Sequence, residues 1–299
     1  MTIIKTIESR TSCRTYSEKP IGPDKLAELK DFLASNTGTP FGSIVRFQLL
    51  NLDDQEIGNL RNLGTYGVIR GARQFIIGAV KKHPMAMEDY GYSMEMIILK
   101  ATALGLGTCL LGGTFNRSGF AQRINLQEDE LLPVISPIGY ARDKKSVIDK
   151  TFRWIAGSDK RKPWDELFYD GIMGKPFTRE SAGAYDMALE CVRIGPSASN
   201  KQPWRIIKAD KRTFFHFYLK RTSGYAKFFK DIQLQNVDMG IAMCHFALPV
   251  NELGLYGNWK VNDPQLSTKG MEYIVSWVRY NPKLWTEKKE GVSYKCCLT

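Results

Sequence analysis

The sequence predicts an α+β fold of two similar lobes, each with a mixed β-sheet flanked by helices. The first observation is length, since 299 residues that are 43% hydrophobic suffice for about two domain cores. The second is a repeated order of elements. A Lys-Pro pair precedes a helical stretch at residue 19 and again at residue 175, and an apolar helical stretch ends at Gly105 and again at Gly254. These offsets, 156 and 149 positions, indicate an internal duplication into residues 1–170 and 171–299. Two unrelated α/β lobes that share a common pattern are the alternative.

Each element of the first half has a local reason. Ile3, Ile4 and Ile7 fall on one face of a helical turn, and residues 10–16 are expected to be extended. Asp24, after a Pro-Ile-Gly-Pro turn, favours a helix over residues 25–34, because an acidic first turn complements the helix dipole. Apolar runs predict strands at residues 45–51, 71–80 and 131–140. A largely apolar helix is expected at residues 92–104.

The second half repeats this order in looser form. We expect a strand that begins at Trp204, an aromatic-rich strand around His216, and an apolar helix over residues 237–252. Trp204 is more typical of a core residue than of a stacking partner. The three histidines are not spaced as metal ligands, so no metal site is predicted.

The composition leaves two classes of function open. The 42 basic residues outnumber 31 acidic ones, and the net charge of +11 raises the question of nucleic acid. The basic residues are nevertheless dispersed among acidic ones, and no nucleic-acid motif accompanies them. A small anionic ligand needs only three or four such charges. Without a signal peptide or a transmembrane run, we expect a soluble, cytoplasmic protein with reduced cysteines and no membrane partner.

Two short motifs lie in opposite halves. Residues 10–14 read Arg-Thr-Ser-Cys-Arg, and in an extended segment alternate side chains share a face, so Arg10, Ser12 and Arg14 can point together. Residues 196–204 read Pro-Ser-Ala-Ser-Asn-Lys-Gln-Pro-Trp, in which prolines stiffen a loop of short polar side chains. Between them, Gly112 and Gly113 permit close backbone approach to a ligand.

With these motifs, and with Pro-Ile-Gly at 137–139 and Lys-Arg-Lys-Pro at 160–163, the chain resembles the FMN-dependent nitroreductase family over most of its length. In that family one subunit supplies Arg-x-Ser-x-Arg and its partner supplies Pro-Ser-x-x-Asn, so each flavin lies at a homodimer interface. Here residues 35–43 lack the second motif and residues 170–175 lack the first. The resemblance is therefore to members with two fused half-similar domains. It implies a nitroreductase-like intramolecular pseudo-dimer, a monomer with one complete site.

The resemblance also implies which residues bind FMN. Guanidinium groups suit a nearly dianionic phosphate, and residues 160–162 close over it without indicating which one makes contact. The backbone at the position of Gly112 lies beside flavin N5. Val68 stands where many members carry a lysine near the flavin, with Arg70 close by, and Gln202 is either a loop brace or a ligand. The expected cofactor-binding residues are Arg10, Thr11, Ser12, Arg14, Leu110, Leu111, Gly112, Gly113, Lys160, Arg161, Lys162, Pro196, Ser197, Ala198, Ser199, Asn200 and Gln202.

The activity that the resemblance implies is electron transfer from NAD(P)H, through flavin N5, to a small organic acceptor such as a nitroaromatic or a quinone. No catalytic side chain is assigned, because the cofactor carries the chemistry. Tyr225, Phe228 and Phe229 are expected either to cover the substrate pocket or to belong to the core. The alternatives are an FMN-binding protein without turnover, serving as store or sensor, and a basic nucleic-acid-binding protein.

Overall fold

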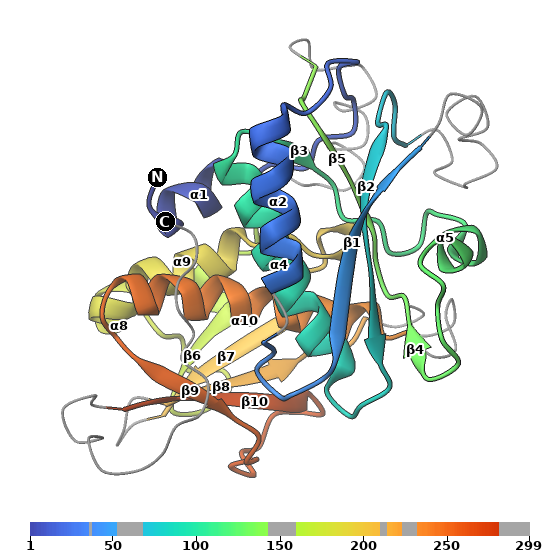
Figure 1. Cartoon of the computed structure of the whole chain (residues 1–299). Helices are drawn as coiled ribbons and strands as arrows, with labels where there is room; N and C mark the ends of the chain where they lie inside the picture. The colour runs from blue at the N-terminus through green and yellow to red at the C-terminus, as the bar shows by residue number, and fades with distance from the viewer. Residues whose placement is uncertain (36–37, 53–67, 143–159, 210–213, 223–231, 281–299) are drawn as a thin grey trace, which may run out of the picture.

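The computed structural model describes residues 1–35, 38–52, 68–142, 160–209, 214–222 and 232–280 (Figure 1). Two five-stranded sheets lie on either side of two long helices, α4 (Ala86–Ala103) and α10 (Leu234–Glu252), which pack against each other. Each long helix contributes to both main cores. Tyr92 of α4 lies in the core of the second sheet, and Ile241 of α10 lies in the core of the first. The predicted mixed fold of helices and sheets is present, and both long helices begin earlier than their apolar patterns predict.

The first sheet comes entirely from the first half of the chain. Its strand order is β1-β2-β5-β3, with β4 paired to β2, and all of these pairs are antiparallel. The only parallel contacts among its described residues are isolated bridges that join Ser12 to Thr108 and Thr15 to Arg70. Its strands are β1 (Val45–Asn51), β2 (Gln74–Lys81), β3 (Gly107–Thr108), β4 (Glu130–Leu131) and β5 (Ser136–Gly139).

One predicted strand was wrong. Instead of a single strand over residues 131–140, the chain forms two short strands, β4 and β5, which are separated by residues 132–135. Pro133 in this gap has no N–H to donate to a sheet. The carbonyl oxygens of Leu132 and Pro133 accept hydrogen bonds from the guanidinium of Arg117 instead.

The second sheet begins at Phe168, after the last strand of the first sheet has ended at Gly139. Its order is β6-β7-β8-β10-β9, parallel between β6 and β7 and antiparallel elsewhere. Its inner face packs aromatic side chains, Phe215 and Phe217 among them, against Phe246 of α10. The strands are β6 (Phe168–Asp170), β7 (Trp204–Lys208), β8 (Phe214–Leu219), β9 (Gly257–Lys260) and β10 (Glu272–Arg279). The duplication and its boundary at residue 170 stay predictions.

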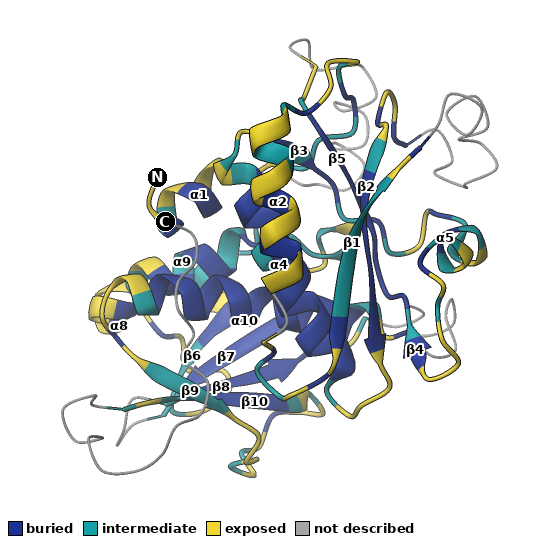
Figure 2. Cartoon of the chain, viewed as in Figure 1, coloured by how far each residue is buried: buried dark blue, intermediate teal, exposed yellow. Residues whose placement is uncertain are grey.

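Shorter helices cover these layers. Helix α1 (Ile3–Ser9) lies against the second half, because Ile3 and Ile7 are buried in the core of the second sheet. Helix α2 (Pro23–Ser35) covers the first half, with an exposed outer face, whereas α4 and α10 are buried almost throughout (Figure 2). The others are α5 (Arg117–Arg123), α7 (Trp164–Leu167), α8 (Arg179–Ala182), α9 (Asp186–Ile194) and the 3-10 turns Gly183–Tyr185 and Ala198–Asn200.

Two glycines allow α4 and α10 to approach closely. A Cβ on Gly91 would lie 2.2 Å from the carbonyl oxygen of Val237, and a Cβ on Gly240 would lie 2.0 Å from the carbonyl oxygen of Glu88. Both distances are shorter than any real contact of a Cβ, so any larger residue would force the helices apart. Gly240 follows Gly91 by 149 positions, and Val237 follows Glu88 by the same number, which equals the offset between the glycines at the ends of these helices.

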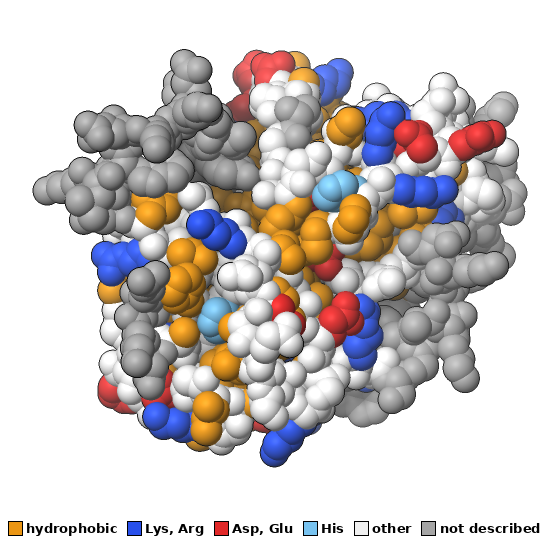
Figure 3. Space-filling view, turned by 90° about the horizontal axis from the view of Figure 1, so that it is seen from below, with side chains coloured by type: hydrophobic (Ala, Val, Ile, Leu, Met, Phe, Trp, Pro, Cys, Tyr) orange, Lys and Arg blue, Asp and Glu red, His pale blue; other side chains and the backbone are white. Residues whose placement is uncertain are grey.

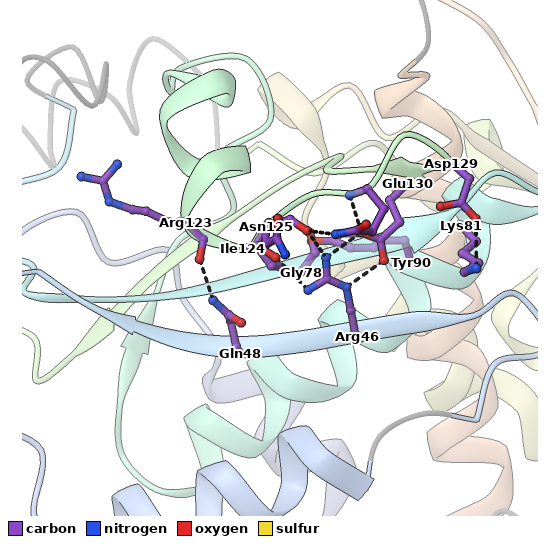
Figure 4. A network of polar contacts seen from close by, with 11 residues as sticks. Arg46, Gln48, Gly78, Lys81, Tyr90, Arg123, Ile124, Asn125, Asp129 and Glu130 are labelled. Carbon is purple, nitrogen blue, oxygen red and sulfur yellow. Dashed lines mark hydrogen bonds and ion pairs between the residues drawn. The ribbon is translucent and has the colours of Figure 1, made fainter.

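An ion pair between Arg46 and Glu130 joins β1 to the segment that follows α5 (Figure 4). The guanidinium of Arg46, on β1, forms two hydrogen bonds with the carboxylate of Glu130, at 2.7 and 2.6 Å. It also donates to the carbonyl oxygens of Ile124 and Asn125, which end helix α5. Because one planar fork satisfies four acceptors, Arg46 fixes the loop after α5 onto the sheet.

On the face seen in Figure 3, the coloured Lys and Arg side chains, which belong to the described residues, are scattered among acidic and neutral ones and form no continuous basic patch. In the part of the chain that the structure describes, no helix is both long enough and apolar enough to span a membrane.

Candidate functional site: a basic cavity between the two halves

The N-terminal motif lies on the edge of the first sheet with alternate side chains on one face. Ser12 forms a parallel bridge with Thr108, and Arg14 accepts a hydrogen bond from the backbone N–H of Arg70 at 2.9 Å. Arg10, Ser12 and Arg14 line a single cavity, as the alternation predicts, whereas Thr11 is exposed and does not.

The loop of residues 196–202 forms the opposite wall. Ser199, Asn200 and Gln202 all have positive φ, at 49°, 52° and 47°. Such left-handed conformations are uncommon outside glycine and cluster at ligand sites. Gln202 is buried and braces the loop, since its side-chain amide donates to the backbone carbonyl of Asn200 and its Oε1 accepts from the N–H of Lys162. Of the two roles left open for Gln202, the structure therefore places it as a brace outside the cavity wall.

Residues 160–162 lie against this loop, and only one of them lines the cavity. Arg161 donates to the Asn200 Oδ1 at 2.5 Å, and Asn200 Nδ2 donates to the carbonyl oxygen of Lys160 at 3.0 Å. The ammonium of Lys162 instead pairs with Glu166 at 2.6 Å, outside the cavity. Arg161 is therefore the member of this basic trio that lines the cavity.

The glycine turn closes the cavity from the first half. Leu110, Leu111, Gly112 and Gly113 all line it. A Cβ on Gly112 would lie 2.8 Å from Leu234 Cδ2 at the start of α10, so the turn and the helix are in close contact only because no side chain intervenes. The carbonyl oxygen of Gly112 accepts a hydrogen bond from Arg117, which fixes the turn.

The complete cavity has a volume of about 660 Å³, within the roughly 300–1,000 Å³ usual for ligand pockets. Its walls combine an apolar surface with a polar rim. The apolar part comes from both halves, and α10 supplies three of its side chains. The lining residues that the sequence analysis did not assign to the site are Val68, Thr108, Cys109, Thr114, Val134, Lys201, Leu234, Val237, Asp238 and Ile241.

The charge of the cavity is strongly positive. Arg10, Arg14, Arg161 and Lys201 line it, and Asp238 is the only acidic residue among the described lining residues. Asp238 is 3% exposed, and its Oδ1 accepts the N–H of Ala198 at 2.9 Å. Burial raises the pKa of Asp238 to about 7, and the Ala198 hydrogen bond only partly opposes this rise.

A buried pair lies behind Arg10. Glu95 Oε1 is 3.9 Å from Arg10 Nε and 2.8 Å from His245 Nε2, while His245 Nδ1 lies 2.8 Å from the carbonyl oxygen of Cys191. A carbonyl only accepts, so Nδ1 carries a proton, and the short contact to Glu95 needs one further proton between the two side chains. The Glu95–His245 pair is then neutral overall, which leaves the positive charge of Arg10 for a ligand.

The structure does not bring every predicted residue to the cavity. Thr11, Lys160, Lys162 and Gln202 lie outside its lining. Tyr225, Phe228 and Phe229 lie outside the described residues. Trp204 is fully buried in the core of the second sheet, as preferred from the sequence. No group of three His, Cys, Asp or Glu residues in the described ranges is placed to hold a metal ion.

Comparison with known proteins gives a consistent result. A family model described as "Putative TM nitroreductase" matches residues 2–250. A "putative nitroreductase" structure from Thermotoga maritima is 19% identical, covers 93% of this chain and 94% of its own, and has a TM-score of 0.59. Comparison with curated proteins gives no match.

Shorter structures match about half of the chain. A "putative nitroreductase in complex with FMN" from Desulfovibrio desulfuricans is 19% identical over 59% of this chain and 98% of its own, with a TM-score of 0.45. An "FMN-dependent nitroreductase" from Clostridium difficile is 19% identical over 48% and 90%, with a TM-score of 0.38.

Proposed function

We propose that this chain, which belongs to the family described as "Putative TM nitroreductase", is an FMN-dependent oxidoreductase that transfers electrons from NAD(P)H to a small organic acceptor such as a nitroaromatic or a quinone. The observation that carries the proposal is the single cavity between Arg10, Ser12 and Arg14 on one side and the loop of residues 196–201 on the other. Two motifs more than 180 residues apart in sequence meet there.

The lining residues fit FMN in charge and in polarity. Three guanidinium groups, from Arg10, Arg14 and Arg161, can pair with a phosphate, and charge-assisted hydrogen bonds of this kind are the strong ones. The neutral donors Ser12 and Ser197 suit a polyhydroxyl chain. The apolar surface from Leu110, Val134 and the start of α10 suits a flat aromatic ring.

The protein groups bind, orient and shield. Bound FMN would supply the redox chemistry, taking hydride at N5 from a reduced nicotinamide and passing electrons to the acceptor. The arginines anchor the phosphate end, and the rigid loop with its left-handed residues fixes the opposite wall. The apolar side chains exclude water, which strengthens the electrostatic interactions inside. With Arg-x-Ser-x-Arg only in the first half and the asparagine loop only in the second, we expect one such site per chain, and a monomer.

The test is a titration of the purified protein with FMN, followed by anaerobic addition of NADH or NADPH. We expect quenching of flavin fluorescence, then bleaching of the bound flavin and its recovery when a nitroaromatic or a quinone is added. Arg161→Ala should weaken FMN binding, whereas Lys162→Ala, which removes a neighbouring cation outside the cavity, should not. A protein that does not quench FMN fluorescence contradicts the proposal, and one that binds FMN but resists reduction supports a store or sensor instead.

A further inference from the structure

Asp238 is the acidic side chain among the described residues that line the cavity, and one oxygen of its carboxyl group has no hydrogen bond to a described residue. Oδ1 accepts the Ala198 N–H, which belongs to the wall of the cavity. Oδ2 is buried from water and has no hydrogen-bond partner among the described residues. A buried carboxylate oxygen without a donor is costly, so this oxygen favours carrying a proton.

Asp89, at the corresponding position of α4, provides a comparison for Asp238. Asp89 lies 149 positions before Asp238, and each is followed two residues later by the glycine of the helix crossing. Asp89 is also buried, but its Oδ1 accepts the N–H of Phe41 and its Oδ2 accepts the N–H of Ser43, both at 3.0 Å. The same position on the two helices therefore has two backbone N–H donors in one half and one in the half that faces the cavity.

We propose that Asp238 couples flavin binding to proton uptake: it holds a proton on Oδ2 when an anionic flavin fills the cavity and releases that proton to solvent when the cavity is empty above neutral pH. The inference rests on the proposed function. An incoming FMN removes water from the cavity and brings a nearly dianionic phosphate, and both effects disfavour a second negative charge nearby. At most one proton enters from solvent per FMN bound, and no group changes oxidation state.

The pKa of Asp238 places the expected proton uptake in a pH range that a binding experiment can cover. The pKa of Asp238 in the empty cavity is about 7, so the group is ionised at pH 8 before the ligand binds. Glu88 on α4 has a pKa also raised to about 7, mainly by burial, and it must be separated by a control. The charged and titratable groups around Asp238 are Arg10, Arg14, Arg161, Lys201 and Cys109 of the cavity and Glu88, Asp89 and Glu95 of α4.

The experiment measures the dissociation constant of FMN between pH 7 and 9, where a phosphate with its second pKa near 6 is already at least about nine-tenths dianionic. For the wild-type protein we expect the constant to rise with pH toward the limit of tenfold per pH unit for one proton. Asp238→Asn, which mimics the protonated carboxyl, should give a nearly constant value. Glu88→Gln should behave as the wild type, because its side chain lies outside the cavity.

Equal pH slopes in the wild type and in Asp238→Asn would overturn the inference, whereas a protein that binds no FMN at any pH would overturn the proposed function itself. A second measurement avoids reliance on the variant. Infrared difference spectra of wild-type protein labelled with ¹³C-aspartate should show a protonated carboxyl band gained on FMN addition at pH 8. No such band in the labelled protein would also refute the coupling.

Discussion

Replacing Asp238 by Asn should stabilise the empty protein at alkaline pH, although it removes a buried hydrogen-bonding carboxylate. The Asn Oδ1 can still accept the Ala198 N–H, and its amide replaces an oxygen that has no donor. The corresponding change at Asp89 should do the opposite, because an amide nitrogen cannot accept the N–H that the second oxygen now receives from Ser43.

The magnitude follows from the pKa of Asp238. Its value is about 7 in the folded state and about 3.9 in an unfolded chain, so the folded protein binds this proton more tightly. The stability that the protonated group contributes is complete below about pH 4 and is lost as the pH rises toward 7. Integrating the linkage from pH 5 to pH 8 gives a loss of about 2.5 kcal/mol in the free energy of unfolding of the wild type relative to Asp238→Asn.

Urea unfolding of the FMN-free protein at pH 5 and pH 8 measures this difference. From pH 5 to pH 8, the free energy of unfolding of Asp238→Asn should increase by about 2.5 kcal/mol relative to that of the wild type. Asp89→Asn should be less stable than the wild type at pH 8, by about 1–3 kcal/mol for a buried donor left unpaired. If the difference in free energy of unfolding between Asp238→Asn and the wild type is the same at both pH values, the folded protein stabilises the ionised carboxylate and the reasoning is wrong.

Three further predictions concern the anion site and the helix crossing. Arg10→Ala should weaken FMN binding by about 1.5–3 kcal/mol, the scale of a hydrogen bond to a charged group, and an unchanged fluorescence titration would contradict its role. Asn200→Ala and Arg161→Ala should be non-additive in a double-mutant cycle of FMN affinity, by at least about 0.5 kcal/mol, because the two side chains are hydrogen-bonded to each other; strict additivity would show that they act separately. Gly240→Ala should cost about 1–3 kcal/mol in urea unfolding, because the new methyl group meets a carbonyl oxygen of α4, whereas Gly22→Ala, with open space around it, should change little; equal effects would refute the close crossing.

The parts of the site that sequence reasoning reached are those set by local rules. Alternation along an extended segment placed Arg10 and Arg14 on one face, and both line the cavity. Thr11, which was also expected to bind the cofactor, points away from that face and is exposed. The polar loop with its prolines marked residues 196–200, and paired glycines marked the turn at Gly112. Each of these signals depends only on neighbouring residues.

The rest depended on contacts that no local pattern contains. The apolar α10 residues of the cavity, Leu234, Val237 and Ile241, have the spacing of any core helix, and only the packing of α10 against α4 brings them to the cavity wall. Asp238 and Asp89 are indistinguishable in sequence, since both stand in Asp-x-Gly, and only the number of N–H donors around each separates them. Pro133 could have predicted the break between β4 and β5, but the apolar residues on both sides of it led to the prediction of one strand over residues 131–140.

The most direct test of the central claim is the number of FMN molecules bound per chain. The claim is that each chain binds one FMN, in the cavity between the N-terminal arginines and the loop of residues 196–201. Flavin released on denaturation from an FMN-saturated, gel-filtered sample should be quantified against protein concentration. We predict one FMN per chain in a monomer, while two per chain, one shared by two chains, or none would contradict it.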